Sequence, residues 1–474
     1  MLAKADEAVP EYQSIESDAI VAGGGPAGVL TAILLARRNH SVVLLTGGRS
    51  RPRIEGLSQR VLDALRAQGL EAAASAVGPE VERLAVWNGE RSARNREHVT
   101  ERTAFDAALL RDAAAAGVRV IKVRRLARGH RAGGIEARAV ALEGDALLLR
   151  GRFLVEARGR SAPSARAREL RGPETTALVR RIDGFGGQRC TAVESFADGW
   201  AWFVADGESA YLQIFLDSGA GLPKRGALTA LFDAQVESLD LIPELIAAGR
   251  SVGPVMTRGA SARLADDLFG PASLRVGDAA AAVDPLSGHG LFEALGSALA
   301  ASAVVHTLLS RPANGELARR FYRERVEGAF WRYARVGRDF YALERRWPAR
   351  PFWSARAEWP DQAAAHAPPD AAPPRIETRP VIEAGFVVAR RVVVTADQPR
   401  GIWRIAEVPL AELLDLLRAS RGDPLEARRA ELARRLAVAE DQLDTALDWL
   451  RARWLLVADE KIALREEMLA PTTG

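Results

Sequence analysis

The chain has 474 residues, of which 48% are hydrophobic and 27% are charged. This length and composition indicate a folded protein of two or three domains, and they exclude a chain disordered throughout, a collagen-like fibre and a disulfide scaffold. The 65 basic and 61 acidic residues nearly balance, so neither a nucleic-acid partner nor a membrane partner is expected.

The cysteine content and the N-terminus limit the possible metal or disulfide chemistry and the expected cellular location. Cys190 is the single cysteine, which excludes an internal disulfide and CxxC metal or redox motifs. The first residues lack the apolar segment of a secretory signal, and no uninterrupted apolar run is long enough to span a bilayer. We therefore expect a cytoplasmic protein, and no metal site is predicted.

The first part of the chain alternates between strands and helices, as α/β proteins do. An apolar strand at 18–22, a glycine turn, a helix at 28–37 and a strand at 41–45 form a βαβ unit. Further on come a helix at 103–116 with a strand at 118–123, and a strand at 274–276 with a helix at 291–309. Between them, residues 195–217 alternate in the manner of antiparallel hairpins inserted into an α/β body.

The turn after the first strand reads Gly-Gly-Gly-Pro-Ala-Gly and fits the GxGxxG pattern of dinucleotide sites. Gly23 permits the tight turn, Gly25 lets the backbone approach a pyrophosphate, and Gly28 lets helix and strand pack closely. The amides that begin the helix, among them that of Ala27, favour the phosphates. The acidic residue expected at the end of the second strand for the ribose is missing, and Thr46 stands there.

A second glycine-rich region follows the strand at 274–276. It contains Gly277 and Asp278, and then the loop Asp-Pro-Leu-Ser-Gly-His-Gly with Pro285, Gly288 and Gly290. Glycines here permit backbone contact with a flat ring, and the following helix start supplies positive potential.

These two motifs resemble those of the flavoprotein monooxygenases typified by para-hydroxybenzoate hydroxylase, whose relatives include flavin-dependent halogenases and geranylgeranyl reductases. The resemblance covers residues 15–345 and implies bound FAD, with Asp278 on the ribityl chain and the loop at Pro285, Gly288 and Gly290 against the flavin ring. A weaker match makes Arg102 a cofactor contact. NADH or NADPH then reduces the flavin transiently, and oxygen forms a C4a-hydroperoxide.

The implied fold class is α/β, a Rossmann-like FAD-binding fold with an inserted antiparallel β-sheet substrate domain. The expected FAD-binding domain comprises 15–80, 100–175 and 264–345, and the expected substrate domain comprises 81–99 and 176–263.

The halogenase relatives need a lysine between flavin and substrate and carry a W-x-W-x-I-P motif. The chain has four lysines, Lys4, Lys122, Lys224 and Lys461, and none is well placed for this role. The sequence after Trp202 departs from the motif.

Four residues on the inserted hairpins are candidates for a substrate wall: Trp200, Trp202, Tyr211 and Gln213. Trp200 and Trp202 alternate along one strand and so face the same side, although aromatic pairs also serve as core packing. His289 interrupts the glycine loop and is the candidate catalytic base, because imidazole titrates near neutrality. Its alternative role is a loop histidine that bonds only backbone.

Residues 346–380 are rich in proline and predict a semi-extended linker without regular helix or central strand. A small module follows at 381–465, with strands in 385–407, helices at 410–420, 424–436 and 440–454, and a strand at 455–457. This order predicts a winged-helix-like α+β module. Its 14 basic and 16 acidic residues from 381 to the end disfavour DNA. It resembles small domains that bind leader peptides by strand addition, and a structural cap is the alternative.

A flavin body joined to such a module resembles the flavoproteins that hydroxylate tryptophan during tryptophylquinone maturation. The main hypothesis is therefore an FAD-dependent monooxygenase acting on a tryptophan side chain in a peptide or protein precursor. The alternatives are a hydroxylase of a small aromatic metabolite, a halogenase or prenyl reductase relative, and a flavin-bound peptide escort protein without turnover. The sequence does not indicate an oligomeric state.

Overall fold

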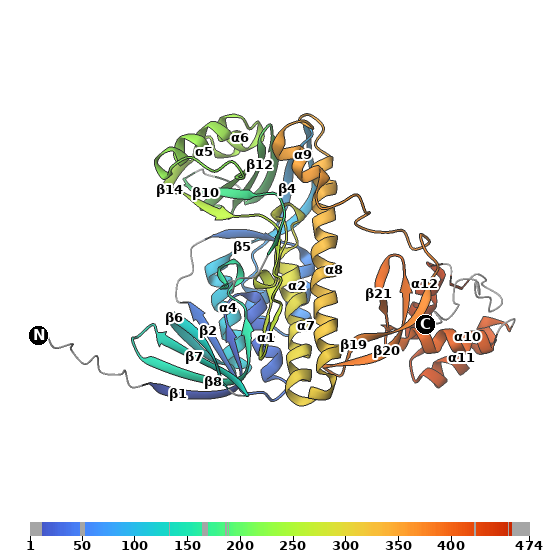
Figure 1. Ribbon diagram of the computed structural model, residues 1–474. Helices are drawn as coiled ribbons and strands as arrows, with labels where there is room; N and C mark the ends of the chain where they lie inside the picture. Colours follow the sequence, from blue (N-terminus) through green and yellow to red (C-terminus); the bar gives the residue numbers. More distant parts are fainter. Residues whose placement is uncertain are drawn as a thin grey trace, which may run out of the picture. The chain divides into compact units, whose positions relative to one another are not determined.

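The computed structural model describes residues 12–47, 53–131, 133–163, 169–184, 187, 189–420, 423–453 and 455–456. The chain divides into two compact units, one formed by Met1–Ser310 and Tyr322–Ala363 and the other by Arg311–Phe321 and Ala364–Gly474. Each unit is described below by itself (Figure 1).

The first unit contains a Rossmann-like sheet. Its parallel part has the order β6-β2-β1-β8-β17, and β7 connects β6 to β8 in antiparallel fashion. The strands are β1 (Gln13–Ala22), β2 (Val42–Gly47), β6 (Arg119–Arg131), β7 (Gly134–Ala141), β8 (Ala146–Glu156) and β17 (Ser273–Arg275), with β16 (Phe269–Gly270) at the edge. Parallel strands need both faces covered, and the βαβ unit expected from the glycine turn is confirmed.

Three helices belong to this sheet: α1 (Pro26–Ala36), α4 (Arg102–Ala115) and α7 (Gly290–Ser310). Helix α1 is buried along nearly its whole length because α4 and α7 both pack on it. Within the described residues, α7 is the one helix long and apolar enough to cross a membrane, and 56% of that stretch is buried inside the protein. Its apolar surface is thus used in core packing.

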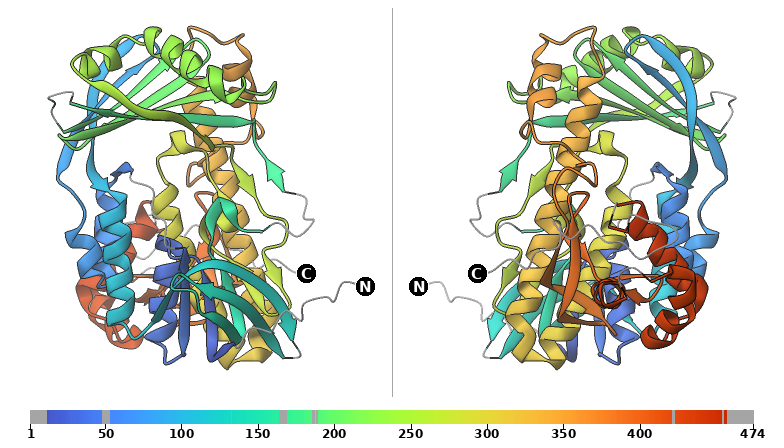
Figure 2. Two further views of the ribbon diagram at one scale, coloured as in Figure 1. Left: turned by 90° about the vertical axis from the view of Figure 1, so that its left-hand side faces the viewer. Right: turned by 90° about the vertical axis from the view of Figure 1, so that its right-hand side faces the viewer.

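A second, strongly curved sheet lies above the α/β body (Figure 2). In the described part of the chain it has eight strands in the order β14-β10-β13-β12-β11-β4-β5-β3. They are β3 (Ile54–Leu57), β4 (Glu80–Trp87), β5 (Glu90–Glu101), β10 (Thr175–Asp183), β11 (Cys190–Phe196), β12 (Gly199–Ala205), β13 (Ser209–Asp217) and β14 (Arg250–Gly259). Strand β3 falls inside the range 15–80 expected for the FAD-binding domain, but it joins this sheet through β5.

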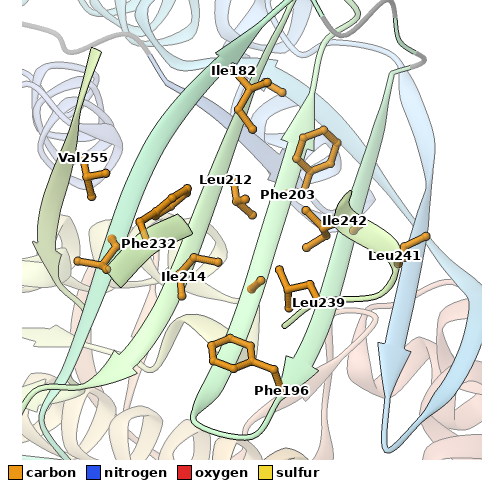
Figure 3. Packing of buried hydrophobic residues seen from close by; sticks show 14 of the residues in the cluster. Ile182, Phe196, Phe203, Leu212, Ile214, Phe232, Leu239, Leu241, Ile242 and Val255 are labelled. Carbon is orange, nitrogen blue, oxygen red and sulfur yellow. The ribbon is translucent and has the colours of Figure 1, made fainter. Parts of the chain in front are cut away.

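The two faces of this sheet have different partners. Helices α5 (Leu228–Glu237) and α6 (Leu241–Ile246) cover the outer face, where Phe232 and Ile242 pack on Phe203, Leu212 and Ile214 of the strands (Figure 3). On the opposite face, Trp200 and Phe215 pack with residues of helix α9 and with Leu286 of the glycine loop. Alternation along β12 and β13 assigns each side chain to one of these faces.

Helix α8 (Gly315–Ala342) is long, and its part from Tyr322 onward, which belongs to the first unit, runs beside α7 toward the second sheet (Figure 1). The sequence-based prediction of a linker at 346–380 is wrong in part, because α9 (Pro351–Glu358) forms there. Pro351 occupies the first turn of α9, where its missing N–H costs no hydrogen bond. Trp353 is 1% exposed and donates from Nε1 to the backbone oxygens of Phe196 and Ala197.

In the second unit, the described residues form a three-stranded antiparallel sheet in the order β19-β20-β21 and three helices. The elements are β19 (Arg375–Glu383), β20 (Phe386–Thr395), β21 (Gln398–Ile402), the short pair β22 (Arg404–Ile405) and β23 (Val408–Pro409), α10 (Leu410–Ala419), α11 (Leu425–Leu436) and α12 (Glu440–Arg451). The predicted hairpin and three helices are confirmed, but β19 begins inside the expected linker. The predicted helix end at 454 and the end of the last strand at 457 lie outside the described residues.

Candidate functional site

Three strand ends meet at the carboxyl edge of the parallel sheet. A Cβ added to Gly23 would lie 2.2 Å from the backbone oxygen of Ala157, which follows β8. A Cβ added to Gly277, which follows β17, would lie 2.7 Å from the Cβ of Ala27. The two glycine motifs, far apart in sequence, therefore form one site at the edge where α/β folds bind ligands.

The glycines of this site fall into two groups. Gly23 has a φ of +128° and packs against protein, and a Cβ on Gly28 would lie 2.0 Å from the oxygen of Gly23. A Cβ on Gly25, Gly288 or Gly290 would instead meet no atom within 4 Å. The first group closes the turn, and the second leaves open space over bare backbone, as a cradle for phosphate or a flat ring requires.

Two helices begin at this cradle. Pro26 starts α1 directly after Gly25, and Gly290 starts α7 at the end of the loop. Amides of a helix's first turn have no partner inside the helix, and the helix dipole makes that end positive. An anion in the cradle therefore meets donors from α1, and α7 adds positive potential next to Pro285, which is exposed.

Asp278 lies in the turn that follows β17, and its side chain is 46% exposed. Arg160 approaches its carboxylate, with Nε 3.8 Å from Oδ2, and also donates to the backbone oxygen of Ser261. Arg263 donates to the backbone oxygens of Gly159 and Asp278. Asp278 is thus an accessible acceptor between two guanidinium groups. Neither arginine was a sequence-based candidate, although the glycine-containing turn 157–161 after β8 was a usable signal for Arg160.

Thr46 occupies the position of the missing ribose acid. It is 8% exposed, and a Cβ on Gly24 would lie 2.3 Å from its Oγ1. The hydroxyl therefore lies directly against the glycine turn.

Arg102, a predicted cofactor contact, is 6% exposed and is engaged by protein carboxylates. Its NH1 lies 2.6 Å from Oε2 of Glu55, and its NH2 lies 2.8 Å from Oδ1 of Asp106. Burial alone would lower its pKa, but the two carboxylates reverse this and raise the pKa of Arg102 above its ordinary value. In this structure Arg102 ties β3 to α4.

His289 lies in the loop between Gly288 and Gly290, half-buried, with its ring 4.8 Å from that of Tyr333 in α8. Within the described structure, its buried Nδ1 has no hydrogen-bond partner. Burial lowers the pKa of His289, so the imidazole is neutral at pH 7. The Tyr333 hydroxyl donates to Glu293 of α7. His289 therefore contacts a residue that links α8 to α7.

The four candidate wall residues share the face of the second sheet that carries Leu286 of the glycine loop. Their exposure separates them into pairs. Trp200 and Tyr211 are 3% and 5% exposed, and Trp200 stacks on Phe215 at a centroid distance of 3.8 Å. Trp202 and Gln213 lie opposite each other in register and are half-buried. Trp200 and Tyr211 therefore build the sheet, whereas Trp202 and Gln213 present side-chain surface.

Asp284 and Tyr341 were missed by sequence reasoning. The Tyr341 hydroxyl lies 3.1 Å and 3.2 Å from the carboxylate oxygens of Asp284, and both residues are buried. Asp284 directly precedes Pro285, which was a usable signal. Tyr341 comes from α8, whose position beside the loop depends on tertiary packing.

The parallel sheet, the paired glycine turns and the two helix ends define a dinucleotide-binding flavoprotein, and their open glycine cradle fits FAD. An FAD binding domain family matches residues 16–210. The chain is 40% identical to the solved structure titled "Peptidyl tryptophan dihydroxylase QhpG essential for tryptophylquinone cofactor biogenesis", which covers 93% of this chain and 100% of that chain with a TM-score of 0.78.

Two curated proteins are more distant. The tryptophan 2-halogenase of Chondromyces crocatus is 26% identical over 374 residues, covering 71% of this chain and 70% of the halogenase. The putative FAD-dependent oxidoreductase LodB of Marinomonas mediterranea is 25% identical over 366 residues, covering 72% of this chain and 96% of LodB.

The chain belongs to the FAD-dependent flavoprotein monooxygenase superfamily, in the family that contains QhpG. The resemblance expected from the glycine motifs is thereby confirmed, and the protein is a flavin-dependent oxidative enzyme. In the described part of the chain, no cluster of three or more His, Cys, Asp or Glu residues is arranged to hold a metal ion.

Proposed function

We propose that this protein uses FAD and NADH or NADPH to hydroxylate the indole ring of a tryptophan in a peptide or protein precursor, a step of tryptophylquinone cofactor biogenesis. The observation that carries this proposal is the 40% identity to the peptidyl tryptophan dihydroxylase over 93% of this chain. The tryptophan 2-halogenase is 26% identical over 71% of the chain.

In this proposal the parallel sheet is the FAD-binding domain and the eight-stranded sheet is the substrate domain. Gly25 and the amide of Ala27 hold the pyrophosphate in the turn that Gly23 and Gly28 shape. Gly277 and Asp278 hold the ribityl chain, and the loop with Pro285, Gly288 and Gly290 lies against the flavin ring. Bound FAD supplies the activation of oxygen. One oxygen atom enters the ring, the other leaves as water, and NADH or NADPH supplies the two electrons.

Trp202 and Gln213 are the proposed substrate contacts, supported by their partial exposure on the face that carries Leu286. Trp202 offers a flat surface for an aromatic ring, and Gln213 can donate or accept a hydrogen bond. Trp200 and Tyr211 fix the strands beneath them. Because this wall is part of a rigid sheet, it can hold a ring at a constant distance from the cofactor.

His289 is the proposed base that takes a proton from the ring during hydroxylation. Its lowered pKa keeps the imidazole neutral and able to accept a proton at pH 7. Its position between Gly288 and Gly290, in the loop proposed to lie against the flavin ring, supports this role.

We propose that the C-terminal module is winged-helix-like and engages the polypeptide. The support lies in its antiparallel sheet, where β19 and β21 are edge strands in the described residues. An edge strand offers unpaired backbone groups to an extended peptide. A cluster with Val393, Leu413 and Leu447 packs α10, α11 and α12 on this sheet, so the edge belongs to a rigid body.

Halogenation is the second candidate, favoured by the 26% identity to the tryptophan 2-halogenase. By resemblance, that reaction needs a lysine between flavin and substrate. Lys122 is exposed on β6, and Lys224 is exposed in the segment that follows β13. Neither lies in the glycine turns or on the face with Trp202, and Lys4 and Lys461 lie outside the described residues. Among the described lysines none supports halogenation, so hydroxylation is the better proposal.

The test is to incubate the FAD-loaded protein with NADH or NADPH and oxygen, and with either a tryptophan-bearing partner polypeptide or free tryptophan. We expect the polypeptide to gain about 16 Da per hydroxyl group, the increment of one oxygen atom that balanced monooxygenation requires. The added oxygen should carry label from ¹⁸O₂. Modification of free tryptophan alone, or chlorine incorporation when chloride is present, would contradict the proposal.

A further inference from the structure

A chain of three buried polar side chains joins the second sheet to the glycine loop. Nε1 of Trp200 in β12 donates to the hydroxyl of Tyr341 at 3.2 Å. The Tyr341 hydroxyl donates in turn to the carboxylate of Asp284, at 3.1 Å and 3.2 Å from its two oxygens. The donors and acceptors thus run in one direction, from the sheet through α8 to the loop.

The last link reaches the loop backbone. Oδ1 of Asp284 accepts from the amide of Leu286 at 2.9 Å, which caps the turn Pro285–Ser287. The same loop continues through Gly288, His289 and Gly290 to the start of α7. A change in the position of the Asp284 carboxylate therefore acts on the backbone proposed to lie against the flavin ring.

Because all three side chains are buried, water cannot easily replace the hydrogen bonds between them. Tyr341 is 2% exposed, Trp200 is 3% exposed and Asp284 is 9% exposed. A buried polar group that loses its partner bears the full desolvation cost, and hydrogen bonds in series reinforce one another at low dielectric. Trp200 cannot rotate away freely because it stacks on Phe215.

The surroundings of Asp284 are also restricted. A cavity of about 10 Å³, the size of one water molecule, lies beside Asp284 and Tyr341 and is also lined by Gly337, Arg338 and Arg356. The charges acting on Asp284 come from Arg356 of α9 and Arg160 of the turn after β8. The Nε of Arg356 is buried without a partner in the described residues. Little space remains for Asp284 to take another position.

We infer that Tyr341 is a positioning residue that couples the substrate face of the second sheet to the flavin loop. The hydrogen bonds through Trp200, Tyr341 and Asp284 hold the strand that carries Trp202 and the loop in one fixed relation, so a ring against Trp202 and the loop each favour the same arrangement. By reciprocity, the state of the loop changes the substrate face by the same coupling free energy. This inference rests on FAD lying against the loop, but not on the identity of the aromatic substrate.

The experiment is a double-mutant cycle that uses FAD binding as its readout and needs no substrate. Trp200→Phe removes the indole N–H but keeps an aromatic ring, and Tyr341→Phe removes the hydroxyl. FAD dissociation constants and the flavin absorbance spectrum are measured for the wild type, both single variants and the double variant. We expect each single variant to bind FAD roughly fivefold more weakly, the effect of one hydrogen bond.

The double variant should then bind FAD no more weakly than either single variant, because both substitutions break the same series of hydrogen bonds. Trp353→Phe is the matched control. It also removes an indole N–H in the same aromatic cluster, but its partners are the backbone oxygens of Phe196 and Ala197. This control should lower the melting temperature and leave FAD affinity and the flavin spectrum unchanged.

Additive effects of the two substitutions, or equal effects of Trp200→Phe and Trp353→Phe on FAD affinity, would overturn the coupling. If Tyr341→Phe does not fold, the comparison of Trp200→Phe with Trp353→Phe decides alone. Because no substrate is present, a failure here is separate from a failure of the proposed tryptophan hydroxylation.

Discussion

The backbone at Gly277 approaches Ala27 so closely that a Cβ on Gly277 would lie 2.7 Å from the Cβ of Ala27. Gly277 also has a φ of +59°, a conformation that favours glycine. Its amide is held by Ser297 of α7, with the hydroxyl oxygen 3.1 Å away. This close approach thus joins the first turn of α1 to the turn after β17 and creates the two-sided glycine cradle proposed for the cofactor.

Two glycine substitutions should separate folding from cofactor binding. Gly277→Ala brings a Cβ into contact with Ala27 and forces alanine into the left-handed conformation that Gly277 already has. We expect it to lower the free energy of unfolding by about 1–3 kcal/mol. The Cβ added by Gly25→Ala meets no protein atom within 4 Å. This variant should leave the melting temperature of the FAD-free protein unchanged and lower its affinity for FAD. Thermal melting and FAD titration are the measurements. Unchanged FAD affinity in Gly25→Ala would remove Gly25 from the proposed site.

Arg102→Met should destabilise the protein strongly. The substitution leaves Glu55 and Asp106 facing a neutral side chain, and breaking a fully buried ion pair on one side costs about 3–5 kcal/mol. We expect a cost at the lower end of this range, because Glu55 keeps its ion pair with Arg53 and both carboxylates are partly exposed. Denaturant unfolding of the FAD-free protein measures this cost. The second variant Glu55→Gln combined with Arg102→Met should recover part of the loss. If stability is retained and only FAD affinity falls, Arg102 is a cofactor contact and not a structural tie.

Trp353 should account for much of the docking of α9. Trp353→Ala removes a side chain that is 1% exposed, and such truncations cost about 3–5 kcal/mol. Trp353→Phe loses chiefly the hydrogen bonds to Phe196 and Ala197 and should cost about 1 kcal/mol. Both values come from chemical denaturation. A loss below about 1 kcal/mol for the alanine variant would mean that α9 is not held by this residue.

Asp284 should make stability depend on pH. Burial raises the pKa of Asp284 above its ordinary value of 3.8, so the folded protein retains a proton that the unfolded chain has lost. The free energy of unfolding therefore falls as the pH rises from 3.8 through the raised value. Asp284→Asn removes this dependence, and the variant should gain stability relative to the wild type toward higher pH. Parallel stability curves for the two proteins would contradict the raised pKa.

His289 should act in the opposite sense. Burial lowers its pKa below the ordinary value of 6.5, so the unfolded chain takes up a proton first as the pH falls. The resulting stability is present above pH 6.5 and is lost as the pH falls toward the lowered value. His289→Asn should lack this loss, as measured by unfolding between neutral and mildly acidic pH. Equal losses in variant and wild type would place the histidine in a water-like environment.

The glycine turns show how far local sequence patterns reach. The βαβ unit, the turn at Gly23–Gly28 and the helix after Gly290 were predictable because glycine spacing and apolar periodicity act over a few residues. The hairpins at 195–217 and the three C-terminal helices followed from the same periodicities. Proline content gave a wrong expectation for α9, because a proline in the first turn of a helix costs little and its effect depends on position.

The partners of the site residues depended on the folded chain. Arg102 was expected at the cofactor. Asp106 lies one turn further along the same helix, but Glu55 comes close enough to hold Arg102 only after β3 and α4 have packed. Tyr341 meets Asp284 and Trp200 because α8 runs between the glycine loop and the second sheet. Local preference therefore set the helices, strands and glycine turns. Burial and long-range packing decided which polar groups pair, because a buried donor or acceptor must find its partner wherever the tertiary structure brings one.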